Sequence, residues 1–293
     1  MPLPLLHYLY PSGLSKFLRQ HEGEASWALV TGASDGIGRA LCFELAARGF
    51  NVVLHGRNET KLARVRDELE ATHPTRRFRT ATADASSFSA ADIDRIVGQV
   101  ADVPLTILIN NVGGTAPLSS NFKYFECTTP KEMEALFSLN IRFPLQLTHA
   151  LLLQLQQQQQ PTLVLNCGSQ AAIGQPYVST YAATKGALHT WTRALAAEQR
   201  AEGTKVEVME TVIGATYTQQ FHGDSNFKPG LFMPTADVMA RAVLSRVGCG
   251  HTSVVAYFWH NVQTTLLYSL LPAATADGII AGVLKPSVEA KIK

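Results

Sequence analysis

The stretch that most constrains the fold is a short apolar run followed by a glycine-rich turn and a helical pattern. Residues 27–31 (WALVT) are apolar enough for a buried strand of a parallel sheet. The turn holds Gly32, Gly36 and Gly38, and residues 39–48 repeat apolar side chains at helical spacing. Such a turn lets the backbone approach a pyrophosphate at a helix N-terminus. We therefore expect a dinucleotide site, although the G-x-x-x-G-x-G spacing departs from the usual fingerprint and a plain tight turn is the alternative.

Apolar runs and helical patterns alternate along most of the chain. Strands that alternate with helices are typical of a parallel sheet covered by helices on both faces. We therefore predict an α/β fold, a doubly wound (Rossmann) parallel sheet of about seven strands in a single domain. The expected strands are residues 27–31, 51–55, 78–83, 105–109, 163–166, 206–212 and 253–257; the expected helices are residues 39–48, 59–72, 90–101, 130–157, 181–203, 236–247 and 260–271.

The end of the second expected strand favours one form of the dinucleotide. A carboxylate there would bind the ribose 2′-hydroxyl of NAD. The chain has Gly56, Arg57 and Asn58 at this point, so a cation replaces the acid. An arginine fits the 2′-phosphate of NADP(H), which we therefore expect as the cofactor. The alternative is that Arg57 is an ordinary solvated surface residue.

Tyr181 and Lys185 are the candidates for acid–base chemistry. They are four residues apart in an Ala- and Leu-rich pattern, so in a helix they share one face. A phenol, with a reference pKa of about 10, is a poor acid–base catalyst at neutral pH, and a neighbouring ammonium lowers that value. Two surface residues at helical spacing would give the same pattern, so the assignment depends on the rest of the chain.

Other polar residues are expected at the carboxyl ends of strands, where such a sheet binds ligands. Asn111 and Ser169 lie at the ends of the fourth and fifth expected strands, and Asp84 follows the third. Asp84 could cap the next helix or meet an adenine ring. Asn140 lies within an otherwise apolar helical pattern, so its amide needs a partner.

These motifs together resemble the classical short-chain dehydrogenases/reductases over roughly residues 26–250. The resemblance is carried by T-G-x-x-x-G-x-G from Thr31, N-N-x-G from Asn110, Asn140, Ser169 and Y-x-x-x-K from Tyr181. The segment WALVTGASDGIG, the Gly56-Arg57 pair and Val112 are similar, more narrowly, to one branch of that family. This branch holds the very-long-chain 3-oxoacyl-CoA reductases and the 17β-hydroxysteroid dehydrogenases.

The resemblance implies four catalytic residues. Tyr181 would give a proton to a carbonyl oxygen, and Lys185 would lower the phenol pKa and hold the nicotinamide ribose. Ser169 would hydrogen-bond the substrate oxygen, and Asn140 would hold a water that links Lys185 to solvent. The implied cofactor-binding residues are Gly32, Ser34, Asp35, Gly36, Ile37, Gly38, Arg57, Asn58, Asp84, Asn111, Val112, Gly113, Tyr181, Lys185 and Thr218.

The chain departs from the family pattern in three places. The interval from Ser169 to Tyr181 is one residue shorter than is common, so the intervening loop must be tighter. Ile213-Gly214 replaces the usual Pro-Gly after the sixth strand, which would alter how Thr218 meets the nicotinamide. The membrane-bound branch also carries an N-terminal hydrophobic anchor, for which residues 1–18 show no pattern.

Composition and segment character complete these expectations. A hydrophobic content of 46% suits a large core, and a net charge of +2 favours no nucleic-acid partner. The four cysteines show no metal or disulfide spacing, so we expect free thiols, no metal site and a cytoplasmic protein. Residues 1–25 would be an extension, residues 26–256 the catalytic domain with a lid at about 217–235, and residues 257–293 an apolar helix and a tail.

Three functions remain open from the sequence. The first is NADPH-dependent reduction of a ketone on a hydrophobic substrate: a 3-oxoacyl thioester, a steroid-like ketone or a polyketide-type ketone. The second uses the same cofactor for epimerisation, dehydration or cyclisation in a secondary-metabolite pathway, and the third is an NADP(H)-sensing protein without turnover. The resemblance implies a homodimer or homotetramer. The apolar helix at 257–271 could contact an intracellular membrane such as the endoplasmic reticulum, or pack on the core or another subunit.

Overall fold

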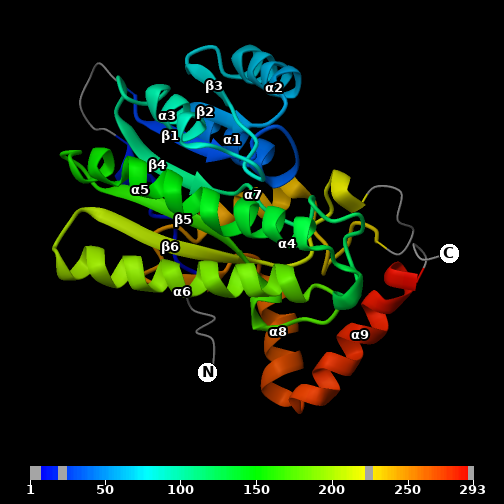
Figure 1. The fold of residues 1–293 in the computed structure, drawn as a ribbon. Helices are drawn as coiled ribbons and strands as arrows, with labels where there is room; N and C mark the ends of the chain where they lie inside the picture. The colour runs from blue at the N-terminus through cyan, green and yellow to red at the C-terminus, as the bar shows by residue number, and fades with distance from the viewer. Residues whose placement is uncertain (1–7, 19–24, 222–226, 290–293) are drawn as a thin grey trace.

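The core of the structure is one parallel sheet whose strands all end on the same side (Figure 1). The computed structural model describes residues 8–18, 25–221 and 227–289. Within them seven strands pair in the order β3-β2-β1-β4-β5-β6-β7, every pair parallel, which confirms the predicted doubly wound fold. The strands are β1 (Trp27–Thr31), β2 (Asn51–Gly56), β3 (Phe78–Thr82), β4 (Leu105–Asn110), β5 (Thr162–Ser169), β6 (Val206–Ile213) and β7 (Ser253–Val255).

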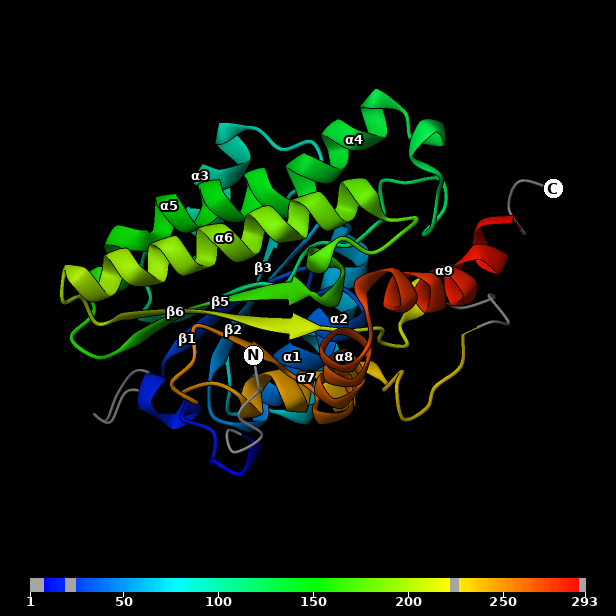
Figure 2. The same ribbon diagram turned by 90° about the horizontal axis from the view of Figure 1, so that it is seen from below.

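Helices cover both faces of this sheet (Figure 2). One face carries α1, α2 and α7, and the other carries α3, α5 and α6. The helices are α1 (Gly36–Ala47), α2 (Glu59–Thr72), α3 (Ala90–Gly98), α4 (Pro130–Phe137), α5 (Phe143–Gln156), α6 (Ser179–Ala201), α7 (Ala236–Ser245), α8 (Phe258–Leu270) and α9 (Ala273–Glu289).

Two hydrophobic cores explain why the central strands are apolar without alternation. Within β1, Val30 packs in the core beneath α1 and α7, whereas its neighbour Leu29 packs in the core beneath α3 and α5. Successive side chains of a strand point to opposite faces, so a strand covered on both sides buries every residue. All residues of β1, β2 and β4 are accordingly buried, which explains why these strands were predictable from sequence.

The long helix expected over residues 130–157 is interrupted, so that prediction was wrong in detail. Helix α4 ends at Phe137, a π-helical turn spans Ser138–Arg142, and α5 begins at Phe143. One wider turn shifts the hydrogen-bond register without breaking the apolar spacing, so it leaves little trace in the sequence. The turn carries Asn140 toward the strand ends.

The segment after residue 271 is also helical, so the expected tail is a second correction. Helices α8 and α9 form a pair that projects beyond the carboxyl ends of β5 and β6 (Figures 1 and 2). Two glycines and Pro286 lower the helix propensity of α9, so the sequence did not predict this helix. Among the described residues, no helix is both long enough and apolar enough to cross a bilayer.

The described part of the N-terminal extension packs against α7. Leu14 and Phe17 are buried in the core beneath α1 and α7, and the Ser12 hydroxyl donates to the carbonyl oxygen of Leu244 at 2.6 Å. The extension is therefore part of the fold, at least over residues 8–18.

Burial of a titratable ring in β2 generates a prediction about acid stability. His55 is fully buried and stacks on Phe143 with ring centroids 4.9 Å apart. Burial lowers the pKa of His55 from 6.5 to about 4. The unfolded chain therefore binds a proton first as the pH falls, and stability is lost between pH 6.5 and about 4.

Replacing the ring should remove this dependence. In His55→Leu we expect the free energy of unfolding to fall by about 2 kcal/mol less between pH 7 and pH 5 than in the wild type. Urea unfolding at both pH values measures this difference. His149→Leu on α5, where the ring is exposed, is the control. Its free energy of unfolding should depend on pH as that of the wild type does. An unchanged pH dependence in His55→Leu would contradict the account.

Candidate active site

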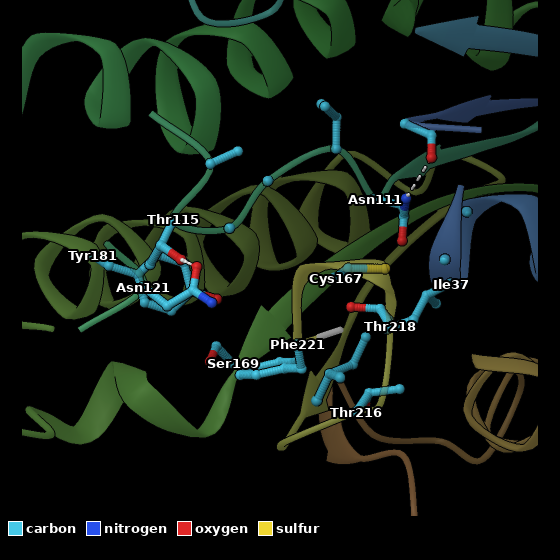
Figure 3. A pocket seen from close by; sticks show the side chains of 18 of the residues that line it. Ile37, Asn111, Thr115, Asn121, Cys167, Ser169, Tyr181, Thr216, Thr218 and Phe221 are labelled. Atoms are coloured by element: carbon cyan, nitrogen blue, oxygen red, sulfur yellow. Dashed lines mark hydrogen bonds between the residues drawn. The ribbon is translucent and has the colours of Figure 1, made fainter. Parts of the chain in front are cut away.

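A cavity of about 740 Å³ lies at the carboxyl ends of the central strands (Figure 3). Its wall brings together fifteen of the residues singled out in the sequence, contributed by the glycine turn, the ends of β2, β4, β5 and β6, and the start of α6. These residues are Gly32, Ser34, Asp35, Gly36, Ile37, Gly38, Arg57, Asn58, Asn111, Val112, Gly113, Ser169, Tyr181, Lys185 and Thr218. Asp84 and Asn140, also singled out, do not line it.

The glycine turn is packed so closely that it needs its glycines. A Cβ at Gly38 would lie 2.1 Å from the carbonyl oxygen of Gly32 and 2.5 Å from Nδ2 of Asn111. Gly32 and Gly36 adopt φ angles of 69° and 53°, which disfavour other residues. Asp35 caps α1 by accepting a hydrogen bond from the backbone N–H of Gly36 at 2.7 Å. The turn therefore brings bare backbone and a helix N-terminus to the cavity surface.

The two asparagines after β4 have different environments. Asn110 is buried and donates to the side chains of Asn166 and Thr148, at 2.8 and 3.0 Å, within the protein interior. Asn111 lines the cavity and donates to the carbonyl oxygen of Thr31 at 2.8 Å. Asn111 therefore ties the end of β4 to the end of β1, beside the glycine turn.

Lys185 lines the cavity but is almost fully buried, and its ammonium donates to the carbonyl oxygen of Cys167 at 2.7 Å. Its Nζ lies 5.9 Å from the centroid of the Tyr181 ring. A Cβ at Gly113 would lie 3.2 Å from this Nζ, so the lysine and the 113–114 backbone are in close approach. An ammonium has three donors, and one bond to Cys167 leaves two for groups that enter the cavity.

Asn140 fixes the backbone that faces Lys185. Its Oδ1 accepts from the N–H of Gly114 at 2.8 Å, and its Nδ2 donates to the carbonyl oxygens of Gly114 and Leu136, each at 3.1 Å. The side chain of Asn140 thus bonds to protein backbone, and the water that this residue was predicted to hold stays a prediction. Its contribution to the cavity is to position the turn at Gly113 and Gly114.

The shortened connection between Ser169 and Tyr181 is accommodated by a compact loop. Residues Gln170–Ile173 form a 3-10 turn, and Gly174 adopts a left-handed φ of 101°. Tyr177 also has a positive φ of 61°, a strained conformation for a non-glycine residue. The loop still places Ser169 and Tyr181 on the same cavity, so losing one residue does not separate them.

The part of the cavity next to the end of β2 carries two cationic side chains. Arg57 and Lys61 both line it, and both side chains are exposed. The Nζ of Lys61 lies 3.8 Å from Oδ2 of Asp35 and donates to Oε1 of Gln219 at 3.5 Å. Lys61 was missed in the sequence, although a lysine in the first turn of a helix is electrostatically unfavourable and could have flagged it.

Asp84 has a local structural partner. Its Oδ1 accepts hydrogen bonds from the backbone N–H and the hydroxyl of Ser86, at 2.9 and 2.7 Å. It stabilises the turn at Ser86, whereas the N-cap of α3 is Ser89, so the expectation that Asp84 could cap this helix was wrong. Its contact with an adenine ring stays a prediction.

The end of the cavity near Tyr181 has residues that sequence motifs did not indicate. Figure 3 shows Thr115, Asn121 and Tyr181 at one end, and Ile37 and Asn111 at the other. The Thr115 hydroxyl donates to Oδ1 of Asn121 at 3.3 Å. Apolar side chains also line the cavity, among them Phe122, which follows Asn121 in the chain, and Val178, Phe221, Phe227 and Leu284.

Two observations limit the chemistry available here. Among the described residues, no group of three His, Cys, Asp or Glu side chains could hold a metal ion. Burial raises the pKa of the Cys167 thiol, which also lines the cavity, to about 12, so it stays protonated at neutral pH. A phenol, a hydroxyl and an ammonium on one wall are suited to giving a proton to an oxygen that develops negative charge.

The sheet order and the cavity at its strand ends define a Rossmann-type α/β protein. The sequence profile of the short chain dehydrogenases matches residues 26–227. The chain belongs to the short-chain dehydrogenase/reductase family and is an oxidoreductase of that family.

Similar proteins agree with this placement. The very-long-chain 3-oxoacyl-CoA reductase of Laccaria bicolor is 35% identical over 234 residues, which cover 78% of this chain and 65% of that protein. This chain thus spans somewhat less than two thirds of that relative. A 7β-hydroxysteroid dehydrogenase structure has a TM-score of 0.74 at 24% identity, covering 91% of this chain and 98% of the other. A short-chain dehydrogenase from Burkholderia cenocepacia, solved with NADP, has a TM-score of 0.66 at 25% identity, covering 78% and 94%.

Proposed function

We propose that this protein is an NADPH-dependent carbonyl reductase that converts a ketone on a hydrophobic substrate into a secondary alcohol. The observation that carries the proposal is one shared cavity. Tyr181, Lys185 and Ser169 line the same space as the glycine turn and Arg57. A proton donor and a dinucleotide cradle therefore face the same ligands.

The residues present fit the cofactor. The turn at Gly32, Gly36 and Gly38 gives a pyrophosphate access to backbone N–H groups, and a Cβ at Gly38 would clash with the carbonyl oxygen of Gly32 within this turn. Arg57 and Lys61 supply two cations at the end where a 2′-phosphate would lie, and Lys61 offsets the charge of Asp35. Asn111 and Thr218, which the sequence also predicted to contact the cofactor, line the same cavity. The bound cofactor supplies the hydride.

The protein's own residues supply the proton and the electrostatics. In the proposed mechanism Tyr181 donates its phenolic proton to the carbonyl oxygen of the substrate. The Lys185 ammonium stabilises the phenolate that remains, and the Ser169 hydroxyl donates to the same substrate oxygen. Asn140 acts as a positioning residue, because it holds the backbone of Gly113 and Gly114 against Lys185. Burial of this lysine strengthens its field because water screens it less.

A long-chain 3-oxoacyl thioester is the substrate class that we favour. The end of the cavity near Tyr181 is apolar and aromatic, which suits an alkyl chain, while the named relatives are very-long-chain 3-oxoacyl-CoA reductases. A steroid-like or polyketide-type ketone would fit the same apolar wall. Thr115 and Asn121 add polar groups at this end that could orient the thioester carbonyl.

Assembly into a homodimer or homotetramer stays a proposal. Leu147 and Leu151 of α5 are fully buried and belong to the core of the subunit. Phe137 and Leu153, by contrast, are 40% and 69% exposed on α4 and α5. Exposed apolar side chains of this kind are available to a partner subunit. Peripheral contact of α8 with a membrane is likewise a proposal.

Removal of one hydroxyl tests the catalytic assignment. We expect Tyr181→Phe to lower turnover by roughly 100-fold or more, because general acid catalysis contributes that much, and to leave the NADPH dissociation constant within about twofold. NADPH consumption with 3-oxohexadecanoyl-CoA measures turnover. Tyr124→Phe, in a neighbouring loop outside the cavity wall, is the matched control. Undiminished turnover in Tyr181→Phe would refute the role of this phenol.

Removal of one cation tests the cofactor assignment. We expect Arg57→Gln to raise the dissociation constant for NADPH about tenfold, since a charge-assisted hydrogen bond is lost, and to leave that for NADH nearly unchanged. Fluorescence titration with both cofactors gives the two constants. Arg64→Gln on α2, where the side chain is 81% exposed, is the control. Equal weakening of NADPH and NADH would show that Arg57 does not bind a 2′-phosphate.

A further inference from the structure

Helix α9 contributes a wall to the cavity although it lies at the far end of the chain. Leu284 is 9% exposed and lines the cavity together with Phe122, Phe221 and Phe227. The Phe227 ring stacks on Phe122 at 5.8 Å and lies 4.9 Å from Phe221. Three chain segments, namely the loop after β4, the loop after β6 and α9, therefore meet around one apolar space.

The side chains of α9 differ in burial. Ala276, Leu284 and Val288 are buried, and of these Leu284 lines the cavity. Ile279 and Val283 are 46% and 62% exposed and do not line it. Leu284 and its neighbour in sequence, Val283, therefore differ both in burial and in contact with the cavity.

A buried histidine fixes the helix that precedes this wall. His260 of α8 is fully buried, and its Nδ1 accepts from the N–H of Gly214 at 3.2 Å. Its Nε2 then donates to the carbonyl oxygen of Phe232 at 3.2 Å. Burial lowers the pKa of His260, so the neutral ring that this pattern requires is favoured. One imidazole therefore links α8 to the end of β6 and to the loop after it.

A second contact ties α8 to the strand that carries Ser169. Gln170, the next residue, donates from Nε2 to the carbonyl oxygen of His260 at 2.9 Å. A Cβ at Gly214 would lie 2.3 Å from Oε1 of Gln170 and 2.6 Å from Nδ1 of His260. Gly214 is thus the residue that makes room for the junction.

Helix α9 itself is intrinsically weak. Gly278 and Gly282 lower helix propensity, and a Cβ at either position would meet nothing within 4 Å. Pro286 lies inside the helix and removes one backbone hydrogen bond. The position of α9 therefore depends on its packing contacts and on the anchoring of α8, more than on its own helical stability.

We propose that α9 is the wall that selects the substrate, with Leu284 contacting the alkyl chain of a long 3-oxoacyl thioester and His260 positioning the wall through α8. The inference rests on the proposed function and names its specificity-determining residue. A bulkier side chain at position 284 would fill part of the apolar space, and the substitution leaves Tyr181, Lys185 and the glycine turn themselves unchanged.

The test compares two tryptophan variants on adjacent positions of α9. We expect Leu284→Trp to raise the KM for 3-oxohexadecanoyl-CoA at least about tenfold, as lost apolar contacts in a pocket commonly do, and to leave the KM for acetoacetyl-CoA within about twofold. Val283→Trp should change neither value. Equal effects on the two substrates, or the same effect from Val283→Trp, would overturn the proposal.

Binding measurements separate this inference from the proposed function. Calorimetry with a long-chain methyl ketone and the NADPH-loaded protein reports occupancy of the apolar space without requiring turnover. If the wild type binds the ketone, and Leu284→Trp binds it about tenfold more weakly, the wall is supported even where no substrate is reduced, and only the reductase assignment fails. If the wild type reduces the thioesters and Leu284→Trp behaves like it, the wall is refuted alone. Failure of the wild type to bind the ketone would also refute the wall.

The positioning role of His260 has its own readout. We expect His260→Ala to raise the KM for 3-oxohexadecanoyl-CoA about fivefold or more while kcat for acetoacetyl-CoA and the NADPH dissociation constant stay within about twofold. His260→Asn retains an acceptor for the N–H of Gly214 and should recover part of the loss. A parallel fall in kcat for both substrates, without rescue by asparagine, would show that His260 only supports the fold.

Discussion

The bond from the Lys185 ammonium to the carbonyl oxygen of Cys167 is the interaction on which the site depends. A buried cation is costly unless polar groups solvate it, so α6 must keep a fixed distance from the end of β5. The same helix carries Tyr181 one turn earlier, and this distance therefore also sets the place of the phenol. The π-helical turn at Asn140 then serves the other side of the lysine, because it holds the backbone at Gly113 in close approach.

Three glycines near the strand ends lie where a polar side chain occupies the space that a Cβ would need. Gly38 leaves room for the Asn111 amide and Gly214 for His260. Gly168, next to Ser169, faces Glu210, whose Oε1 would lie 1.9 Å from a Cβ there. The Oε2 of this buried carboxylate pairs with Nδ1 of His189 at 2.6 Å. At the carboxyl ends of the strands, polar side chains thus pack directly against the backbone of glycine residues.

Local signals in the sequence predicted the sheet and many of the residues that line the cavity. The turn from Gly32 to Gly38 and the pair Tyr181 and Lys185 are set by spacing within one element, and apolar runs mark strands that are buried on both faces. Residues that act from a distant element had no such signal. Leu284 lines the cavity because α9 packs there in the folded protein. The two glycines and the proline of α9 prevented its prediction as a helix.

Residue type indicated Asn140, but its contacts depend on the backbone around it. Its side-chain amide bonds to the backbone of Gly114 and Leu136, and the water that this residue was expected to hold stays a prediction. The short spacing predicted a tight loop after Ser169, but not its backbone conformation, which depends on a left-handed Gly174 and a positive φ at Tyr177. In both cases the sequence indicated the residue, and the backbone around it determined its contacts.

The transfer of deuterium from NADPH that carries two deuterium atoms at C4 to a 3-oxoacyl thioester tests the central claim most directly. The label position in the product is read by mass spectrometry and NMR after a single turnover of the purified protein. A carbonyl reductase must place deuterium on the carbinol carbon, and the transfer should show a primary isotope effect when chemistry limits the rate. A product that forms without deuterium, or with the label returned to the cofactor, would contradict net reduction and favour epimerisation, dehydration or cyclisation on the same scaffold.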